Sequence, residues 1–391
     1  MAISDSGMDR PLRIFLSAGE TSGDLHASNL IRAIRKSRPG SEFAALGGNA
    51  MEAAGARLIH NMLGEFAVMG FIDAFRVVPA IKRLRDATLA QLASWKPDAA
   101  VLVDYPGFNL NFAWHLKKMG MPVFYYICPQ LWAWAPWRVR KIAARVDKAL
   151  VVFPFEEHFY KRHHVPVEYV GHPLGDVFAS RTLDEEFVKS GPLSGAEFLI
   201  ALLPGSRAKE IVSGLPVKVA AAKIIKAARP EATFAIPVTT EEHAVIARGI
   251  AADAGLDATV FVGKTYEIMS LARFALATSG TATLELAHFG VPMVVLYRTN
   301  PGGLLFTKTL LTIPNIALVN IVAGREIVPE LVYWRDHSER IAEMALGVIT
   351  DKECYVSARR NVRAVGQLIE APGASMRAAK AILAGIGAGR Q

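Results

Sequence analysis

FLIALLPGSRAKE, residues 198–210, is the stretch that decides the fold. An apolar run leads into Pro204 and Gly205, and a segment with helical spacing follows at once. This pattern is typical of a buried strand in a parallel sheet that turns directly into a helix. The first N–H groups of such a helix are expected to be free, and Arg207 lies among them, so the turn is predicted to bind an anion. The alternative is a solvated surface arginine, although a cation at a helix start opposes the helix dipole.

Apolar runs alternate with segments of helical period along the whole chain, which predicts an α/β fold with two parallel sheets. Strands are expected at 12–18, 43–46, 99–104, 123–127, 149–153 and 167–171, and then at 198–204, 232–238, 258–263, 274–278, 292–297 and 316–320. The predicted domains are 1–180 and 195–350, with helices at 351–391 that either cross back to the first domain or mediate dimerisation. Ligands of two such sheets bind beyond the carboxyl ends of the strands, in the cleft expected between the domains.

Composition narrows the class of protein. An apolar content of 52% with 20% charged residues excludes wholesale disorder, and the net charge of +8 predicts an anionic partner. No nucleic-acid-binding module is recognisable, so phosphorylated metabolites or an acidic membrane surface are favoured. No export signal or membrane-spanning run is found, and the protein is expected to be cytoplasmic, either soluble or peripheral. The two cysteines form no CxxC pair, and DxD and HExxH motifs are absent, so no metal is expected.

Two carboxylates follow predicted strands of the first half. The strand AAVLV places Asp104 at its carboxyl end, and Pro106 turns the chain at once. Asp104 is either a residue that starts a turn or a general base for a hydroxyl nucleophile. SAGETSGD follows the first strand, where Ser22 or Asp24 is expected to cap the next helix. A cap does not explain Glu20, for which hydrogen bonding to a sugar is the plausible use.

TSGTATLELAHFGVP, residues 278–292, has the same strand, turn and helix pattern. Ser279 is expected to cap the helix, and Gly280 lets a ligand approach. Glu285 is four residues after Thr281, on the same face of the helix start and among apolar neighbours. It is either a glutamate in a salt bridge or at the surface, or the acceptor of two hydrogen bonds from vicinal hydroxyls such as those of a ribose.

Two aromatic segments have two interpretations each. FAVMGFIDAFRVVPAIKRL, residues 66–84, has an apolar stripe at helical spacing, and YYICPQLWAWAPWR, residues 125–138, leads into the basic WRVRK. An apolar stripe ordinarily belongs to the core. If the stripe is partly exposed, with positive charge beside it, it forms an interfacial membrane surface.

The order of these motifs resembles that in the lipid A disaccharide synthases, a family of inverting GT-B glycosyltransferases with two Rossmann-like domains. The resemblance rests on GETSGD, AVMG, DYPGFN, YYICPQLWAW, PFE, VGHP, LLPGSR, SGTATLE, MVVLYR and NIVAGREIVPEL. It implies transfer of 2,3-diacylglucosamine from its UDP donor to 2,3-diacylglucosamine 1-phosphate, without metal or cofactor, on the cytoplasmic face of the inner membrane. It leaves a homodimer open.

The resemblance also implies roles for particular residues. Asp104 becomes the leading candidate for the general base, and Glu20 is the second. The expected donor-binding set is Gly205, Ser206, Arg207, Glu210, Ser279, Gly280, Thr281, Thr283, Glu285 and Asn320. The set expected to contact the acceptor or the membrane is Asn109, Val68, Met69, Phe71, Ile72, Phe75, Trp132, Trp134, Arg138 and Lys141. The alternatives are another UDP-sugar GT-B enzyme, such as the transferase of peptidoglycan synthesis or a UDP-sugar 2-epimerase, or a noncatalytic protein that binds nucleotide sugars or acidic lipids.

Overall fold

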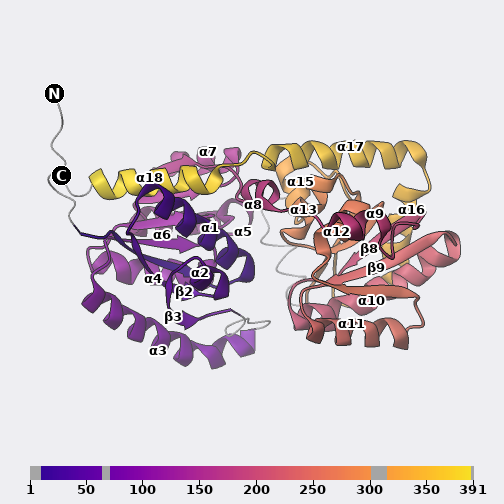
Figure 1. Cartoon of the computed structure of the whole chain (residues 1–391), viewed down its shortest axis with the longest axis horizontal. Helices are drawn as coiled ribbons and strands as arrows, with labels where there is room; N and C mark the ends of the chain where they lie inside the picture. Colours follow the sequence, from indigo (N-terminus) through magenta and orange to yellow (C-terminus); the bar gives the residue numbers. More distant parts are fainter. Residues whose placement is uncertain (1–9, 64–70, 301–314, 389–391) are drawn as a thin grey trace. The chain divides into compact units, whose positions relative to one another are not determined.

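The computed structural model describes residues 10–63, 71–300 and 315–388, and the chain divides into two compact units (Figure 1). The first unit is Met1–Asp176 with Pro372–Gln391, and the second is Val177–Ala371. Each unit has a parallel β-sheet with helices between its strands, which confirms the predicted α/β class. The division of acceptor and donor binding between the two domains stays a prediction.

The first unit's sheet has, within the described residues, seven parallel strands in the order β3-β2-β1-β4-β5-β6-β7. The order reverses between β1 and β4, which makes their carboxyl ends the switch point of the sheet. Both strands are almost wholly buried, as their apolar sequences require. The strands are β1 (Arg13–Ala18), β2 (Glu42–Gly47), β3 (Arg57–Asn61), β4 (Ala99–Val103), β5 (Val123–Tyr126), β6 (Lys148–Val151) and β7 (Val167–Tyr169).

Helices join the strands of the first unit. Phe108 and Phe112 on α4 pack with Phe15 of β1 and Tyr125 of β5 in the core on one side of this sheet. The helices are α1 (Thr21–Ser37), α2 (Asn49–Ala53), α3 (Phe71–Trp95), α4 (Pro106–Lys118), α5 (Leu131–Trp134), α6 (Val139–Arg145) and α7 (Pro154–Arg162), with α8 (Leu174–Ser180) beginning at the boundary and α18 (Ala374–Ala388) returning to this unit.

The last helix, α18, completes the first unit after the chain has passed through the second. It lies beside α1 (Figure 1), and the side chains of Ala378 and Ile382 are fully buried. The carboxylate of Asp176 accepts a hydrogen bond from the backbone N–H of Ser375 at 2.7 Å, and Arg377 donates to the carbonyl of Val170 at 2.7 Å. Apolar and polar contacts therefore both hold α18 on this unit.

The second unit's sheet has six parallel strands in its described part, in the order β10-β9-β8-β11-β12-β13. Its switch point lies between β8 and β11. The strands are β8 (Phe198–Leu203), β9 (Ala232–Val238), β10 (Ala258–Val262), β11 (Phe274–Thr278), β12 (Met293–Arg298) and β13 (Glu330–Tyr333). The helices are α9 (Glu185–Ser190), α10 (Ala208–Ala228), α11 (Glu241–Asp253), α12 (Thr265–Leu271), α13 (Ala282–Phe289), α15 (Leu318–Ala323), α16 (Ser338–Ile349) and α17 (Lys352–Ile369).

The strand expected at 316–320 is wrong, and every other expected strand coincides with an observed one. The chain there forms α15, because the carboxylate of Glu330 accepts hydrogen bonds from the N–H groups of Ile316 and Ala317 at 2.8 and 2.9 Å. This carboxylate satisfies N–H groups at the helix start, as a capping side chain does. The edge strands β3 and β13 were not predicted.

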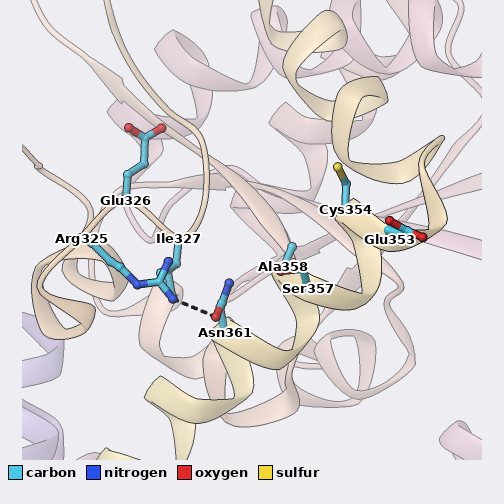
Figure 2. Close-up of a pocket in the computed structure, with 8 residues that line it drawn as sticks. All are labelled: Arg325, Glu326, Ile327, Glu353, Cys354, Ser357, Ala358 and Asn361. Atoms are coloured by element: carbon cyan, nitrogen blue, oxygen red, sulfur yellow. Dashed lines mark hydrogen bonds between the residues drawn. The ribbon is translucent and has the colours of Figure 1, made fainter.

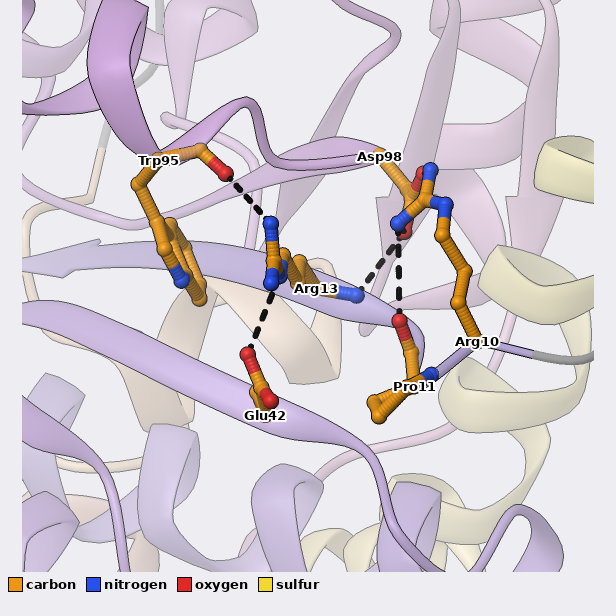
Figure 3. A network of polar contacts seen from close by, with 6 residues as sticks. All are labelled: Arg10, Pro11, Arg13, Glu42, Trp95 and Asp98. Carbon is orange, nitrogen blue, oxygen red and sulfur yellow. Dashed lines mark hydrogen bonds and ion pairs between the residues drawn. The ribbon is translucent and has the colours of Figure 1, made fainter.

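Polar contacts close the amino end of β1 (Figure 3). Asp98 accepts a hydrogen bond from the backbone N–H of Arg13 at 2.8 Å and forms an ion pair with Arg10. The guanidinium of Arg13 donates to Glu42 at 3.0 Å and to the carbonyl of Trp95 at 3.1 Å. The charged side chains at the amino end of β1 are therefore paired with one another, and ligands of such sheets bind at the opposite end, beyond the carboxyl ends of the strands.

Candidate active site

The carboxyl ends of β1 and β4 bring the two predicted carboxylates of the first unit together. Ala18 is paired with Val103 across these strands, so the turns that carry Glu20 and Asp104 start side by side. The two groups interact electrostatically, because the charge of Glu20 contributes to raising the pKa of Asp104. The pairing of β1 with β4 explains why these two predicted residues lie near each other, and their roles in a site stay predictions.

Asp104 is held in an unusual backbone conformation. It has a φ of 47° and its neighbour Tyr105 has a φ of 50°, a region that non-glycine residues rarely adopt. The carbonyl of Asp104 accepts hydrogen bonds from the Tyr125 hydroxyl at 2.7 Å and from the Asn109 side chain at 2.8 Å, which fix this turn. Burial first, and then Glu20, raise the pKa of Asp104 from 3.8 to about 6. A carboxylate with such a pKa suits proton abstraction near neutral pH.

Asn109 organises this edge of the sheet from inside. Its side chain is fully buried, accepts a hydrogen bond from the Ser17 hydroxyl at 2.8 Å, and donates to the carbonyls of Asp104 and Val103 at 2.8 and 3.2 Å. Its amide therefore joins β1 to the turn after β4. The contact with the acceptor expected for Asn109 stays a prediction.

Asp24, the last acidic residue of the GETSGD segment, does not cap α1 as was expected. Helix α1 begins at Thr21 with no side-chain cap, so the expected capping by Ser22 or Asp24 is wrong. Asp24 is buried and accepts hydrogen bonds from the N–H groups of Gly48, Ala50 and Met51 at 2.9, 2.9 and 3.1 Å. It caps α2 instead, a long-range contact that residue spacing could not indicate.

A second buried carboxylate in this unit, Glu156 of the PFE motif, was not predicted. It accepts hydrogen bonds from the N–H groups of Val152 and Phe153 and from the indole N–H of Trp132, the latter at 3.2 Å. Burial raises its pKa to about 7. Trp132 is thereby held against Phe155, with its ring centroid 4.9 Å away. Glu156 positions the WAW segment.

Among the other residues expected to contact the acceptor or the membrane, the structure describes the side chains of some and not of others. Lys141 is exposed on α6 and Arg138 is partly exposed. Val68 and Met69 lie outside the described residues. Phe71, Ile72, Phe75 and Trp134 belong to described helices, but their side chains lie outside the description.

In the second unit, the turn after β8 is shaped by an internal carboxylate. Glu210 accepts hydrogen bonds from the N–H groups of Ser206 and Arg207 at 2.9 and 3.3 Å and pairs with the Arg207 guanidinium at 3.3 Å. Both N–H groups precede α10, which begins at Ala208, so the prediction that the first N–H groups of the helix bind an anion stays untested. Gly205 has a φ of 109°, and a Cβ there would lie 2.3 Å from the Glu210 carboxylate, so only glycine fits. The Arg207 side chain is 43% exposed and accessible to an anion.

The turn after β11 lies beside it, because Ala277 is paired with Leu203 across the two strands. Helix α13 begins at Ala282 without a side-chain cap, so the capping expected of Ser279 is wrong. The Thr283 hydroxyl is buried and donates to the carbonyl of Gly280 at 2.9 Å. The Ser279 and Thr281 side chains are partly exposed, as an anion-binding turn requires. The donor contacts expected in both turns stay predictions.

Glu285 has a partner that was not predicted, the Tyr266 hydroxyl on α12, which donates to it at 2.6 Å. The Arg181 guanidinium lies 4.1 Å from the centre of the Tyr266 ring. Burial raises the pKa of Glu285, and the Tyr266 hydrogen bond and the charge of Arg181 oppose the rise. The hydrogen bond fixes the orientation of the carboxylate. Its proposed contact with a ribose is untested.

Asn320 is fully buried and ties together the NIVAGREIVPEL segment. It donates to Glu330 and to the carbonyl of Val328 at 3.0 and 2.9 Å, and it accepts from the N–H groups of Ile327 and Val328 at 2.8 and 3.0 Å. These bonds use both ends of its amide. The contact with the nucleotide expected for Asn320 stays a prediction.

A pocket of about 410 Å³ lies between this segment and α17 (Figure 2). Across it Arg325 donates a hydrogen bond to Asn361 at 2.9 Å. The lining residues are Arg325, Glu326, Ile327, Glu353, Cys354, Ser357, Ala358 and Asn361. They include none of the predicted site residues, so the pocket carries no part of the proposed chemistry.

No helix in the described part of the chain is long and apolar enough to cross a membrane. The described residues also contain no group of three or more His, Cys, Asp or Glu that could hold a metal ion. The expected independence of metal stays a prediction.

Comparisons with known structures support the fold. The UDP-GlcNAc 2-epimerase from Neisseria meningitidis bound to UDP-GlcNAc aligns with a TM-score of 0.61 at 14% identity, covering 96% of this chain and 100% of that one. The glycotransferase of kitacinnamycin aligns with a TM-score of 0.60 at 16% identity, covering 96% and 99%. At such identities these likenesses show the fold alone, and the fold is of the GT-B type.

Sequence comparison is more specific. A family model described as lipid-A-disaccharide synthetase matches residues 14–382. A lipid-A-disaccharide synthase of Geobacter metallireducens is 37% identical over 377 residues, which cover 96% of this chain and 97% of that protein. The synthase of Syntrophus aciditrophicus is 35% identical over 367 residues, covering 94% and 96%. The chain thus belongs to the lipid-A-disaccharide synthetase family.

Proposed function

We propose that the chain transfers 2,3-diacylglucosamine from its UDP donor to the 6-hydroxyl of 2,3-diacylglucosamine 1-phosphate. The products are the β-1,6-linked lipid A disaccharide phosphate and UDP. Family membership supports glycosyl transfer in lipid A synthesis. The observation that carries the mechanism is the pair of carboxylates, Glu20 and Asp104, at the switch point of the first sheet.

Asp104 is the proposed general base. Its raised pKa keeps it able both to lose a proton near neutral pH and to accept one from a hydroxyl. The acceptor oxygen forms a bond to the anomeric carbon while the bond from that carbon to the UDP oxygen breaks, and the hydroxyl proton goes to Asp104. Attack opposite the leaving group inverts the configuration. Glu20 is the alternative base, and if it is not the base it binds the acceptor.

The second unit is proposed to bind the donor. The turns after β8 and β11 would receive the diphosphate, with the Arg207 guanidinium and the start of α13 stabilising the charge that develops on UDP. Glu285, oriented by Tyr266, would accept hydrogen bonds from the ribose hydroxyls. Glu210 shapes the first turn and holds Arg207 in it.

Purified chain, incubated with both diacylglucosamine substrates and a chelator, should form disaccharide phosphate and UDP. Asp104→Asn should retain UDP binding and lose product formation about 10²- to 10⁴-fold. Absence of product with the unchanged chain would refute the proposed reaction. Conversion of UDP-GlcNAc to its 2-epimer would instead support the alternative enzyme class, and binding of UDP-sugars without any turnover would support a noncatalytic protein.

Peripheral membrane association is the second part of the proposal. Trp137 is 58% exposed and precedes α6, on which Arg140 and Lys141 are exposed. On the neighbouring α4, Trp114 is exposed and Lys118 lies over its ring at 3.7 Å. Exposed indoles beside lysine and arginine suit the surface of an anionic membrane.

Vesicles with and without anionic lipid distinguish this surface from an ordinary solvated face. Trp137→Ser with Lys141→Glu should reduce sedimentation with anionic vesicles, while UDP binding is retained. Val245→Ser, at an exposed apolar residue of α11, is the control. If the double variant binds anionic vesicles as strongly as the control, Trp137 and Lys141 do not belong to a membrane-binding surface. Phe71→Ser with Ile72→Ser tests the 66–84 segment in the same assay.

A further inference from the structure

A buried lysine lies at the edge of the second sheet where the donor is proposed to bind. Lys218 is on α10 and is only 1% exposed. Its side chain runs back toward the start of the helix, where Nζ donates to the carbonyl of Gly214 at 3.3 Å and to the Thr278 hydroxyl at 2.9 Å. Lysine is rarely buried so completely unless it is paired.

The contact with Thr278 connects Lys218 to both proposed phosphate-binding turns. Thr278 is the last residue of β11, and its hydroxyl donates in turn to the carbonyl of Leu203, the last residue of β8, at 3.1 Å. The residues that follow are 204–207 after β8 and 279–281 after β11. One ammonium group is thus linked, through one hydroxyl, to the carboxyl ends of both central strands.

No carboxylate in the described part of the chain forms an ion pair with Lys218. Glu210, at the start of the same helix, is the charged group that raises its pKa, but burial has the larger effect and lowers the pKa to about 7. Strands β8, β9 and β11 have no titratable side chains. Tyr333 of β13 is neutral near pH 7, because burial raises its pKa. The neighbouring helices α11 and α16 carry their charged residues on the exposed surface, and His243 of α11 is partly exposed. These exposed residues are Glu241, Glu242, Arg248, Asp253, Glu339, Arg340 and Glu343.

A buried ammonium without a carboxylate partner destabilises the unliganded protein. That cost falls when an anion binds nearby, because the attraction between opposite charges is strong where water is excluded. We propose that Lys218 is a positioning residue of the donor site, which holds the turns after β8 and β11 together through Thr278 and supplies the positive charge that the donor's diphosphate neutralises. This inference rests on the proposed binding of UDP-sugar by the second unit.

The proposal predicts that UDP binding takes up a proton. With a pKa of about 7 in the free protein, a large fraction of Lys218 is neutral at pH 7.5, and a bound diphosphate favours the ammonium form. Binding should therefore take up more than about half a proton at this pH. The affinity for UDP should fall as the pH rises above 7, because each binding event must then protonate more of the lysine.

Isothermal titration of the full chain with UDP, at pH 7.5 in buffers of different ionisation enthalpy, measures this proton uptake. Lys218→Met should lose the uptake and bind UDP about tenfold more weakly, as expected for the loss of one nearby charge. Its affinity for uridine, measured by competition, should change less than about twofold, because uridine has no phosphate. Lys223→Met is the matched control, since Lys223 is exposed on the same helix.

Several results would overturn the inference. If Lys218→Met takes up protons and binds UDP as Lys223→Met does, the proposed role of Lys218 is refuted. The donor site itself would remain supported. Equal losses for UDP and uridine would mean that the lysine only maintains the fold. If Lys218→Met does not fold, the chain without a substitution still tests the proposal. A UDP affinity that is constant from pH 7 to 9 would contradict it. An unchanged chain that binds no UDP would refute the donor site itself.

Discussion

Asp104→Asn should make the protein more stable while it removes activity. Folding raises the pKa of this carboxyl from 3.8 to about 6. A carboxyl raised in this way destabilises the folded state increasingly as the pH rises from the unfolded pKa to the folded one, and the full cost applies above pH 6. A difference of about two pKa units corresponds to at most about 3 kcal/mol. Because Asp104 is partly exposed and water screens its charge, we expect a gain of about 1–2 kcal/mol at pH 8.

Urea unfolding at pH 8 and pH 5 measures this gain. At pH 5 the gain should be about half as large, because most of the carboxyl is then protonated in the folded protein, whereas it is still mostly ionised in the unfolded chain. Asp86→Asn, at an exposed carboxylate whose pKa is lowered by its hydrogen bond to Arg85, should give no gain and serves as the control. A loss of stability for Asp104→Asn at pH 8, or the same difference at both pH values, would refute the electrostatic explanation.

Three further predictions concern neighbouring groups. Glu20→Gln removes a charge that raises the pKa of Asp104. In a plot of kcat/KM against pH, the rise on the acidic side should therefore move to lower pH by about one unit or less. If this rise does not move, the two groups are not coupled. Tyr266→Phe deletes the hydrogen bond to Glu285 and should weaken UDP binding about 3- to 30-fold in calorimetry with little change in kcat, and an unchanged affinity would count against Glu285 as a ribose ligand. Asp98→Ala should lower the free energy of unfolding by about 1–3 kcal/mol in urea without affecting UDP binding, and a change in UDP affinity would contradict its purely structural role.

The central strands and the turns after them could be predicted from sequence because they depend on local patterns. Apolar runs that end at Gly, Pro or Asp mark buried parallel strands, and the residues just beyond them include Asp104, Arg207 and Ser279. The edge strands β3 and β13 were missed since they are only partly buried and their apolar signal is weak.

The partners of the polar residues could not be predicted, because they come from distant segments. The buried Asn320 and the partly buried Glu330 are hydrogen-bonded to each other at the start of α15, and no spacing rule joins these two positions. The residues beside Lys218 in the sequence are apolar, and nothing in the sequence distinguishes it from the other lysines of α10. Its burial becomes evident only when β11 brings Thr278 to its ammonium group.

The sequence position of α18 has a consequence for how the protein is made. A ribosome must synthesise the whole of the second unit, Val177–Ala371, before the helix that packs on α1 exists. Until then the surface that receives Ala378 and Ile382 is without its cover, so the nascent first unit exposes apolar side chains while its neighbour is already free to fold. The first unit can therefore complete its core only after the whole of the second unit has been synthesised.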